Sequence, residues 1–160
     1  MTNTQPIKTH LSNDEVISTL NNLITTCRDG QNGFQTAMEG VEDSHLKMSF
    51  AEFSQQRAHF VGELQEQVRS LGGDPENTGS VAASLHRGWM DIKAVITSKD
   101  EAAILAECER GEASAVKQYQ EALQANLPAP VQEIVAKHLS AVYEAHNRIK
   151  SSYAARAASA

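Results

Sequence analysis

Cysteine, aromatic residues and long apolar runs are all scarce in this chain of 160 residues. Cys27 and Cys108 are too few for a disulfide scaffold, and no CxxC motif indicates redox chemistry or a zinc knuckle. No apolar run approaches the roughly 20 residues of a membrane-spanning helix, and residues 1–15 lack the charged and then apolar order of a signal peptide. We therefore expect a cytoplasmic protein without a membrane partner, in which both cysteines are buried and reduced.

Positive charge is also in short supply. The formal net charge is −6 and the isoelectric point is about 5.5, which opposes binding to phosphate backbones, so we expect no nucleic-acid partner. The sequence contains no nucleophile elbow, phosphate loop or dinucleotide fingerprint, and nothing therefore indicates a hydrolase, a kinase or an NAD-dependent enzyme.

The composition that remains favours helix. Hydrophobic residues make up 41% of the chain and aromatic residues only 5%, while Ala, Leu, Glu and Gln are frequent. Unbranched side chains lose little rotamer freedom in a helix, so this composition predicts an all-α protein. The length suits a single domain over residues 1–160 with a core of its own.

The chain carries a faint copy of itself at a spacing of 81 residues, at which Cys27 and Gly30 fall on Cys108 and Gly111. The further matched residues are Leu23, Ile24, Leu46, Phe53, Val61, Glu63 and Val68, which fall on Ile104, Leu105, Leu127, Ile134, Val142, Glu144 and Ile149. Each half predicts a long helical hairpin, and two hairpins predict a four-helix bundle whose functional groups project into the core. Glycine inside a helix costs about 1 kcal/mol, so we expect Gly30 and Gly111 to mark the closest helix crossing.

The first hairpin has helix signals at its ends. Ser12 and Glu15 form a capping box, which predicts a first helix from there to about His45. Ser49 is the expected cap of a second helix, which stops at residues 72–73, a Gly-Gly pair.

A loop of sequence GGDPENTGS and a short connector helix over residues 80–96 are expected next. A third helix should start near Asp100 and end before Leu127, and Pro130 can lie in the first turn of a fourth. The connection is long enough for the chain to return along the bundle, so the second helix should run parallel to the third and the first to the fourth. The ends of the chain, 1–11 and 152–160, are expected to be frayed.

Four polar side chains project into apolar helix faces at 100° per residue. They are two pairs of repeat partners, Gln31 with Glu112 and Arg57 with His138. Counting from the hairpin turns places Glu112 on the order of 6 Å along the axis from Arg57, on a neighbouring parallel helix. A buried Arg57–Glu112 ion pair is therefore within reach, and such pairs can fix helix register.

A metal site is the alternative interpretation of the inward carboxylates. Di-iron bundles hold their ions at mid-bundle with a Glu from each of two helices and a Glu-x-x-His from each of the other two. This sequence offers His59-x-x-x-Glu63 and Glu144-Ala-His146, but no Glu-x-x-His. A partial or asymmetric site for iron or another divalent metal would use Glu63, Glu109, Glu112, Glu144 and His146.

The connector carries a second unusual cluster, His86-Arg87-Gly88-Trp89. Trp89 is the only tryptophan and should pack the connector against the bundle. His86 and Arg87 could hydrogen-bond carboxylates beneath it.

These residues carry a resemblance. The stretch GSVAASLHRGWMDIK followed by DEAAILAECERGEASAVKQYQEAL resembles the bacterial family of PA2169-type four-helix-bundle proteins, a domain of unknown function in the ferritin-like superfamily. The resemblance runs from Val16 to Ile149 and implies a ferritin-like fold. Ferritin-like relatives commonly bind two irons, but the ligand set is incomplete here, and the family itself has no settled activity.

Two interpretations of function follow. The first is a non-catalytic protein with a structural, interaction or stress-related role, acting as a homodimer or with a protein partner that the sequence does not name. The alternative is a ferritin-like protein that binds iron or another metal at the partial carboxylate and histidine site.

Overall fold

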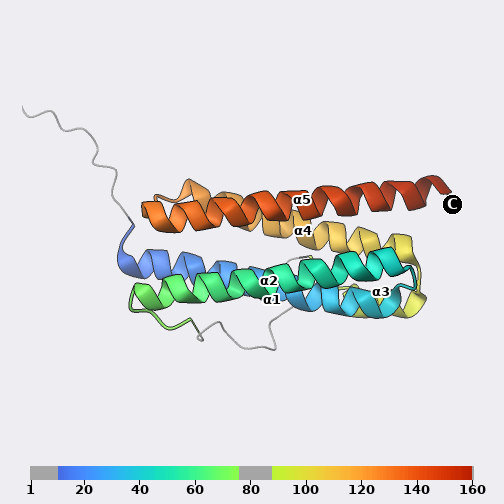
Figure 1. Ribbon diagram of the computed structural model, residues 1–160, viewed down its shortest axis with the longest axis horizontal. Helices are drawn as coiled ribbons and strands as arrows, with labels where there is room; N and C mark the ends of the chain where they lie inside the picture. The colour runs from blue at the N-terminus through green and yellow to red at the C-terminus, as the bar shows by residue number, and fades with distance from the viewer. Residues whose placement is uncertain (1–10, 76–87, 160) are drawn as a thin grey trace, which may run out of the picture.

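The computed structural model describes residues 11–75 and 88–159, and within them the chain forms helices and turns without a β-strand. The helices are α1 (Asn13–Gly40), α2 (Ser44–Ser70), α3 (Ile92–Ser98), α4 (Glu101–Gln124) and α5 (Ala129–Ser159). Figure 1 shows the four long helices lying lengthwise against one another, with α3 beside one end of the bundle. None of these helices is both long and apolar enough to cross a membrane.

Two antiparallel hairpins, α1–α2 and α4–α5, make up the bundle (Figure 1). α1 and α5 run in one direction and α2 and α4 in the other. The predicted all-α bundle of two hairpins, with a long connection between them, is therefore confirmed. α1 packs against α2 and α4, and α5 packs against α4 and more loosely against α2. α2 and α4 thus face each other diagonally across the core, and the prediction that they are neighbours is wrong.

The turn between α1 and α2 comes earlier than predicted. α1 starts at the predicted capping box, but it ends at Gly40 and not near His45. Asp43, not Ser49, caps α2, because its carboxylate accepts the backbone N–H groups of His45 and Leu46.

The other helix ends agree with the sequence except in the connector. α2 ends at Ser70, shortly before the Gly-Gly pair, and α4 begins at Glu101 with Asp100 as its cap, next to the predicted start. Pro130 lies in the first turn of α5. Of the predicted connector helix 80–96, residues 76–87 lie outside the described residues, and the described part is helical only in α3.

The end of α5 does not fray where the sequence predicted it. The helix continues through residues 152–159, where Arg156 joins it to the turn before α2 and to the start of α4. The Arg156 guanidinium binds the Asp43 carboxylate at 2.8 Å and the Glu101 carboxylate at 3.2 Å. Alanine, frequent in this segment, also has the highest helix propensity.

The core is divided into two clusters along the bundle. The aliphatic cluster consists of Val16, Leu20, Leu23, Ile24, Cys27, Phe60, Val61, Leu64, Val68, Ala115, Val116, Tyr119, Ala122, Leu127, Val131, Val135 and Val142. The aromatic cluster consists of Phe34, Ala37, Val41, Leu46, Phe50, Phe53, Trp89, Ile92, Ile104, Leu105, Cys108, Ala145 and Ile149. Arg57 and Glu112 lie in the short stretches of α2 and α4 between them. Both cysteines are buried and neither is in a disulfide, as predicted.

Candidate functional site

A buried ion pair crosses the middle of the bundle. Arg57 on α2 and Glu112 on α4 are 1% and 0% exposed. The two guanidinium nitrogens Nη1 and Nη2 donate to the two carboxylate oxygens at 2.5 Å each. This parallel, bidentate geometry is the strongest form of an arginine–carboxylate pair. The structure therefore contains the ion pair that the spacing of the polar residues predicted, across the diagonal of the bundle.

Gly30 makes room for this ion pair. A Cβ atom at Gly30 would lie 3.0 Å from Arg57 Nη1 and 3.4 Å from its Cγ, so even alanine would press on the guanidinium. On another side, the Phe34 ring lies 5.6 Å from the guanidinium carbon, within range of a cation–π contact. Gly30 thus accommodates a long side chain, rather than the close crossing of helices that the sequence suggested.

The charge on Arg57 is maintained by its partner. Burial alone would lower the pKa of the guanidinium, but the Glu112 carboxylate outweighs burial and raises that pKa. Arg57 Nε, however, donates to no acceptor among the described residues. A buried pair that is satisfied only in part fixes geometry more than it adds net stability.

A hydrogen-bond network made of Cys27, Tyr119, His138 and Glu63 lies next to the ion pair. The Cys27 thiol and the Tyr119 hydroxyl are 3.0 Å apart, and the same hydroxyl is 3.0 Å from His138 Nδ1. His138 Nε2 lies 3.0 Å from Glu63 Oε1. The imidazole stacks on Phe60 with ring centroids 3.8 Å apart. The network thus runs from a buried thiol on α1 through α4 and α5 to a carboxylate on α2 that is 29% exposed.

The protonation states determine which group donates and which group accepts in each hydrogen bond of this network. Burial lowers the pKa of His138, so its imidazole is neutral near pH 7. Burial would raise the pKa of Glu63, but the hydrogen bond from His138 helps to lower it below its ordinary value, so Glu63 is ionised. His138 Nε2–H therefore donates to Glu63, and Nδ1 accepts from Tyr119. Burial raises the pKa of Cys27 to about 11, so the thiol keeps its proton and donates to the Tyr119 oxygen.

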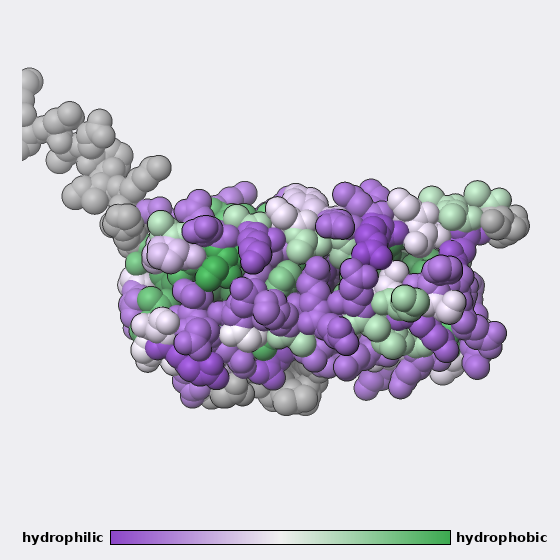
Figure 2. All heavy atoms as spheres, viewed as in Figure 1, coloured by the Kyte–Doolittle hydropathy of each residue, from purple (hydrophilic) through white to green (hydrophobic). Residues whose placement is uncertain are grey.

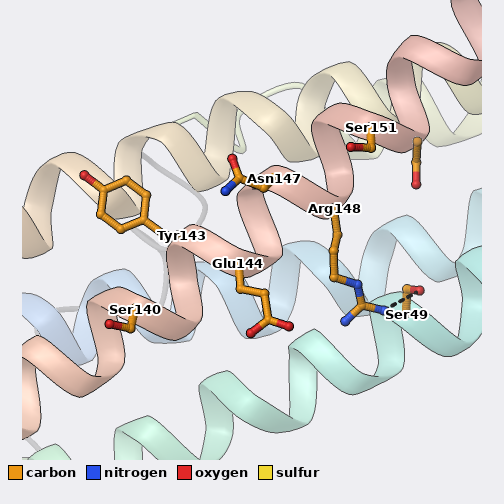
Figure 3. A pocket seen from close by; sticks show the side chains of 8 residues that line it. Ser49, Ser140, Tyr143, Glu144, Asn147, Arg148 and Ser151 are labelled. Carbon is orange, nitrogen blue, oxygen red and sulfur yellow. Dashed lines mark hydrogen bonds between the residues drawn. The ribbon is translucent and has the colours of Figure 1, made fainter.

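The five residues of the predicted metal site do not come together. Glu112 is held by Arg57 and Glu63 by His138, while Glu109 and His146 pair with each other at 3.1 Å between α4 and α5. Glu144 is exposed and points from α5 toward α2 in Figure 3. Across residues 11–75 and 88–159, no three His, Cys, Asp or Glu side chains are placed to hold a metal ion.

A di-metal centre therefore does not fit the described residues. Such centres need several carboxylates turned toward one point at mid-bundle. At that level, both oxygens of Glu112 face a guanidinium instead.

Gln31 differs from the other inward polar residues. Arg57, Glu112 and His138 are fully buried, but Gln31 is only partly buried. Its contribution to the core is its backbone carbonyl, which accepts the hydroxyl of Ser54 at 3.0 Å.

Trp89 joins the connector to the bundle, as predicted, and is 2% exposed. Its indole lies over Gly33 of α1 and Gly111 of α4, where a methyl group on either glycine would overlap the ring. Phe34 meets it edge-on at 5.0 Å. Gly111 therefore makes room for the indole rather than for a helix crossing. His86 and Arg87, which were expected to assist Trp89, lie outside the described residues.

The buried polar contacts of two residues, Tyr119 and Glu107, were not recognised from the sequence. Tyr119 was assigned only to the inward face, although a buried tyrosine hydroxyl needs a partner and thus signals a polar network. Glu107 was not considered, yet it is 1% exposed, pairs with Arg110 and accepts the backbone N–H of Asp91 at 2.6 Å. Its position between Ile104 and Cys108 on the inward face was the available signal.

An open groove runs along α5 beside α2 (Figure 3). The residues that line it all carry polar groups and are Ser49, Ser140, Tyr143, Glu144, Asn147, Arg148, Ser151 and Ser152. Arg148 spans it, hydrogen-bonding Ser49 at 3.3 Å and Glu52 at 3.3 Å.

Comparisons with known proteins support the fold and give a family. A crystal structure of a two-domain protein from Anabaena variabilis, with DJ-1/ThiJ/PfpI-like and ferritin-like domains, matches 92% of this chain with a TM-score of 0.75 and 16% identity. The match spans only 41% of that protein, and at this identity it shows the fold alone, which is ferritin-like. No curated protein matches the chain. The family model described as Domain of unknown function (DUF2383) matches residues 15–125, most of the chain, and the chain therefore belongs to this family.

Proposed function

We propose that this protein is a non-catalytic ferritin-like bundle with a structural or interaction role, in which an ion pair takes the place of a metal centre. The observation that carries the proposal is the bidentate Arg57–Glu112 pair. The pair occupies both oxygens of Glu112, an inward carboxylate that has no carboxylate counterpart in the repeat, since Gln31 stands at the matching position.

The charge at this level opposes a cation. Arginine keeps its proton at any ordinary pH, and here Glu112 raises its pKa further. A divalent ion would therefore have to bind beside a fixed positive charge and displace two charge-assisted hydrogen bonds.

The same pair supports a structural role. Because α2 and α4 belong to different hairpins, the Arg57–Glu112 pair joins the two hairpins across the core. Hairpins paired in another register would leave both charges buried without a partner, which is strongly unfavourable. A bundle held in one arrangement presents a constant surface, and the partner we propose is a protein, first of all a second copy of this chain.

The experiment is a metal-binding measurement on the full chain purified without chelator. We expect metal content well below one ion per chain, and no absorbance change when Fe(II) and then oxygen are added. The control is the Glu144→Gln variant, which removes an exposed carboxylate and should leave both results unchanged. Stoichiometric iron that is lost in Glu63→Gln or Glu112→Gln would overturn the proposal.

Metal binding away from the centre is the second candidate, and one observation favours it. Glu109 Oε1 and His146 Nε2 lie 3.1 Å apart on adjacent helices, with 35% and 16% of their side chains exposed. A carboxylate and an imidazole are suitable ligands for a divalent transition metal, although two ligands make a weak site. Iron or zinc binding that is abolished by His146→Gln and unaffected by Glu112→Gln would establish this alternative.

A further inference from the structure

The seam between α2 and α5 is the loosest contact between neighbouring long helices of the bundle. Figure 2 shows hydrophobic side chains reaching the surface between these helices near the start of α5. Polar links between described residues of the two helices include one between Glu63 and His138 and one from Arg148 to Glu52 and Ser49. The same two α5 residues also contact rings of α2, since His138 stacks on Phe60 and the Arg148 guanidinium lies 4.8 Å from the Phe53 ring.

The two links differ in burial. The Arg148–Glu52 pair is 43% and 63% exposed, so water and salt screen it and its contribution is small. His138 is 0% exposed and holds Glu63 from inside the core. The Glu63–His138 hydrogen bond is therefore the link that a change of protonation affects most.

A proton added to His138 would reverse the hydrogen-bond network. With a neutral imidazole, Nδ1 accepts from Tyr119, whose oxygen accepts from the Cys27 thiol. With a cationic imidazole, both ring nitrogens donate. Nδ1–H then points at the Tyr119 oxygen, and the hydroxyl must turn its hydrogen to the Cys27 sulfur. The thiol hydrogen loses its acceptor inside the aliphatic cluster.

The groups around His138 include one that favours a cation. The anionic Glu63 on α2 raises the pKa of the imidazole. Burial, Lys137 on α5 and His59 on α2 lower it, and burial is the largest effect. The facing groups from α4 and α1, Tyr119 and Cys27, are both neutral because burial raises the pKa of each.

We propose that Glu63 and His138 form a proton-operated latch that holds α5 against α2. The latch is closed when Glu63 is ionised and His138 is neutral. Protonation of His138 keeps Nε2–H on Glu63, but it places a cation inside the aliphatic cluster and reverses the hydrogen-bond network behind it. Protonation of Glu63 removes the negative charge that accepts this hydrogen bond. α5 then separates from α2 along the seam, beginning at the end of the bundle where α5 starts.

Lowering the pH reduces the contribution that His138 and Glu63 each make to stability. His138 has a lowered pKa in the fold, so its contribution to stability is complete above the ordinary value of 6.5 and declines as the pH falls below it. Glu63 also has a lowered pKa, so its contribution is complete above 4.5 and is lost as the pH falls through its value in the fold. The latch therefore weakens with acid, starting near pH 6.5.

The test is amide hydrogen exchange of the full chain between pH 7.5 and pH 5.0, corrected for the intrinsic exchange rate at each pH. We expect protection in residues 131–143 of α5 and 59–68 of α2 to fall about tenfold on acidification, with a smaller change at the α1–α4 contact. His138→Gln should abolish this pH dependence. Glu63→Gln keeps an acceptor for Nε2–H but loses the charge that favours the cation, so it should move the transition to lower pH.

The matched control is His146→Gln, which removes the other imidazole–carboxylate link, between α5 and α4. This variant should retain the wild-type pH dependence at the seam. The proposal is overturned if wild-type protection at the seam changes no more than at the α1–α4 contact. It is also overturned if Glu63→Gln, a substitution at a partly exposed position, leaves the transition at its wild-type pH.

Discussion

The two ends of the bundle core are filled in different ways. In the aromatic cluster, Phe34 meets Phe50, Phe53 and Trp89 with ring centroids between 5.0 and 5.9 Å, and the fit depends on shape. In the aliphatic cluster, a hydrogen-bond network passes through apolar side chains and ends at the surface. One four-helix frame can thus obtain a unique core either from steric fit or from matched donors and acceptors.

The two ends of the core also differ in which part of the chain supplies their key side chains. At the aromatic end, Trp89 comes from the connector and enters between two helices over glycines. At the aliphatic end, all four members of the hydrogen-bond network come from the long helices themselves. The first end should therefore respond mainly to changes of volume, and the second to changes of protonation and hydrogen bonding.

The largest effect is expected from Trp89→Ala, which removes the main shape-determining group of the aromatic end. Burial of a tryptophan and the cavity it would leave predict a loss of about 3–5 kcal/mol in the free energy of unfolding. Urea denaturation followed by circular dichroism measures this loss. Met90→Ala, at a neighbour that is 73% exposed, is the control and should change stability by less than about 0.5 kcal/mol. A loss as small as that of the control would show that the connector is not part of the core.

Glu112→Gln changes the buried ion pair that lies between the two clusters. It leaves the Arg57 charge buried without its anionic partner, so we expect a loss of about 3–5 kcal/mol in the free energy of unfolding. The double variant Arg57→Met/Glu112→Leu removes both charges and should recover most of this loss. A double variant that is no more stable than Glu112→Gln would mean that the core needs the pair for more than charge neutralisation.

Tyr119→Phe breaks the hydrogen-bond network while it nearly preserves side-chain volume. His138 Nδ1 and the Cys27 thiol both lose a partner, which predicts a loss of about 1–3 kcal/mol in the free energy of unfolding. Phe34→Leu at the aromatic end changes shape without touching a hydrogen bond and serves as the comparison. If thermal denaturation finds Tyr119→Phe as stable as the wild type, the network does not stabilise the aliphatic end.

Glu109→Gln should have the smallest effect, because its link to His146 lies partly in solvent. Exposed ion pairs contribute about 0.2–1 kcal/mol, so the expected loss is within that range and should shrink further in high salt. Denaturation at two salt concentrations measures it. A loss as large as that of Tyr119→Phe at both salt concentrations would contradict this prediction. Burial would then not explain how the contribution of the Glu109–His146 link differs from that of the Glu63–His138 link.

The sequence predicted the parts of this structure that follow from regular helix geometry. The 3.6-residue period placed Arg57, Glu112 and His138 inward, and counting from the turns brought the first two within reach of each other. The period does not fix how each helix is rotated against its neighbours. The Glu63–His138 link and the diagonal placement of α2 and α4 therefore could not be predicted.

The errors at helix ends have local causes. The turn before α2 contains no glycine or proline after Gly40, and its capping residue Asp43 was overlooked because Ser49 is also a common cap. The order of the last turns of α5 depends on Arg156 and the distant Asp43, a pairing that only the fold brings together. The room that Gly33 and Gly111 leave for Trp89 likewise arises from three separate parts of the chain.

The space above Gly33 and Gly111 that the Trp89 side chain fills could also bind a free indole molecule. Because Gly33 and Gly111 leave space for a flat ring, Trp89→Gly would create an empty, apolar cavity of nearly the size of indole. Cavities of this kind stay dry and take up small aromatic molecules. Free indole added to that variant should thus refill the slot and restore stability, which would turn the junction between connector and bundle into a switch controlled by a small molecule.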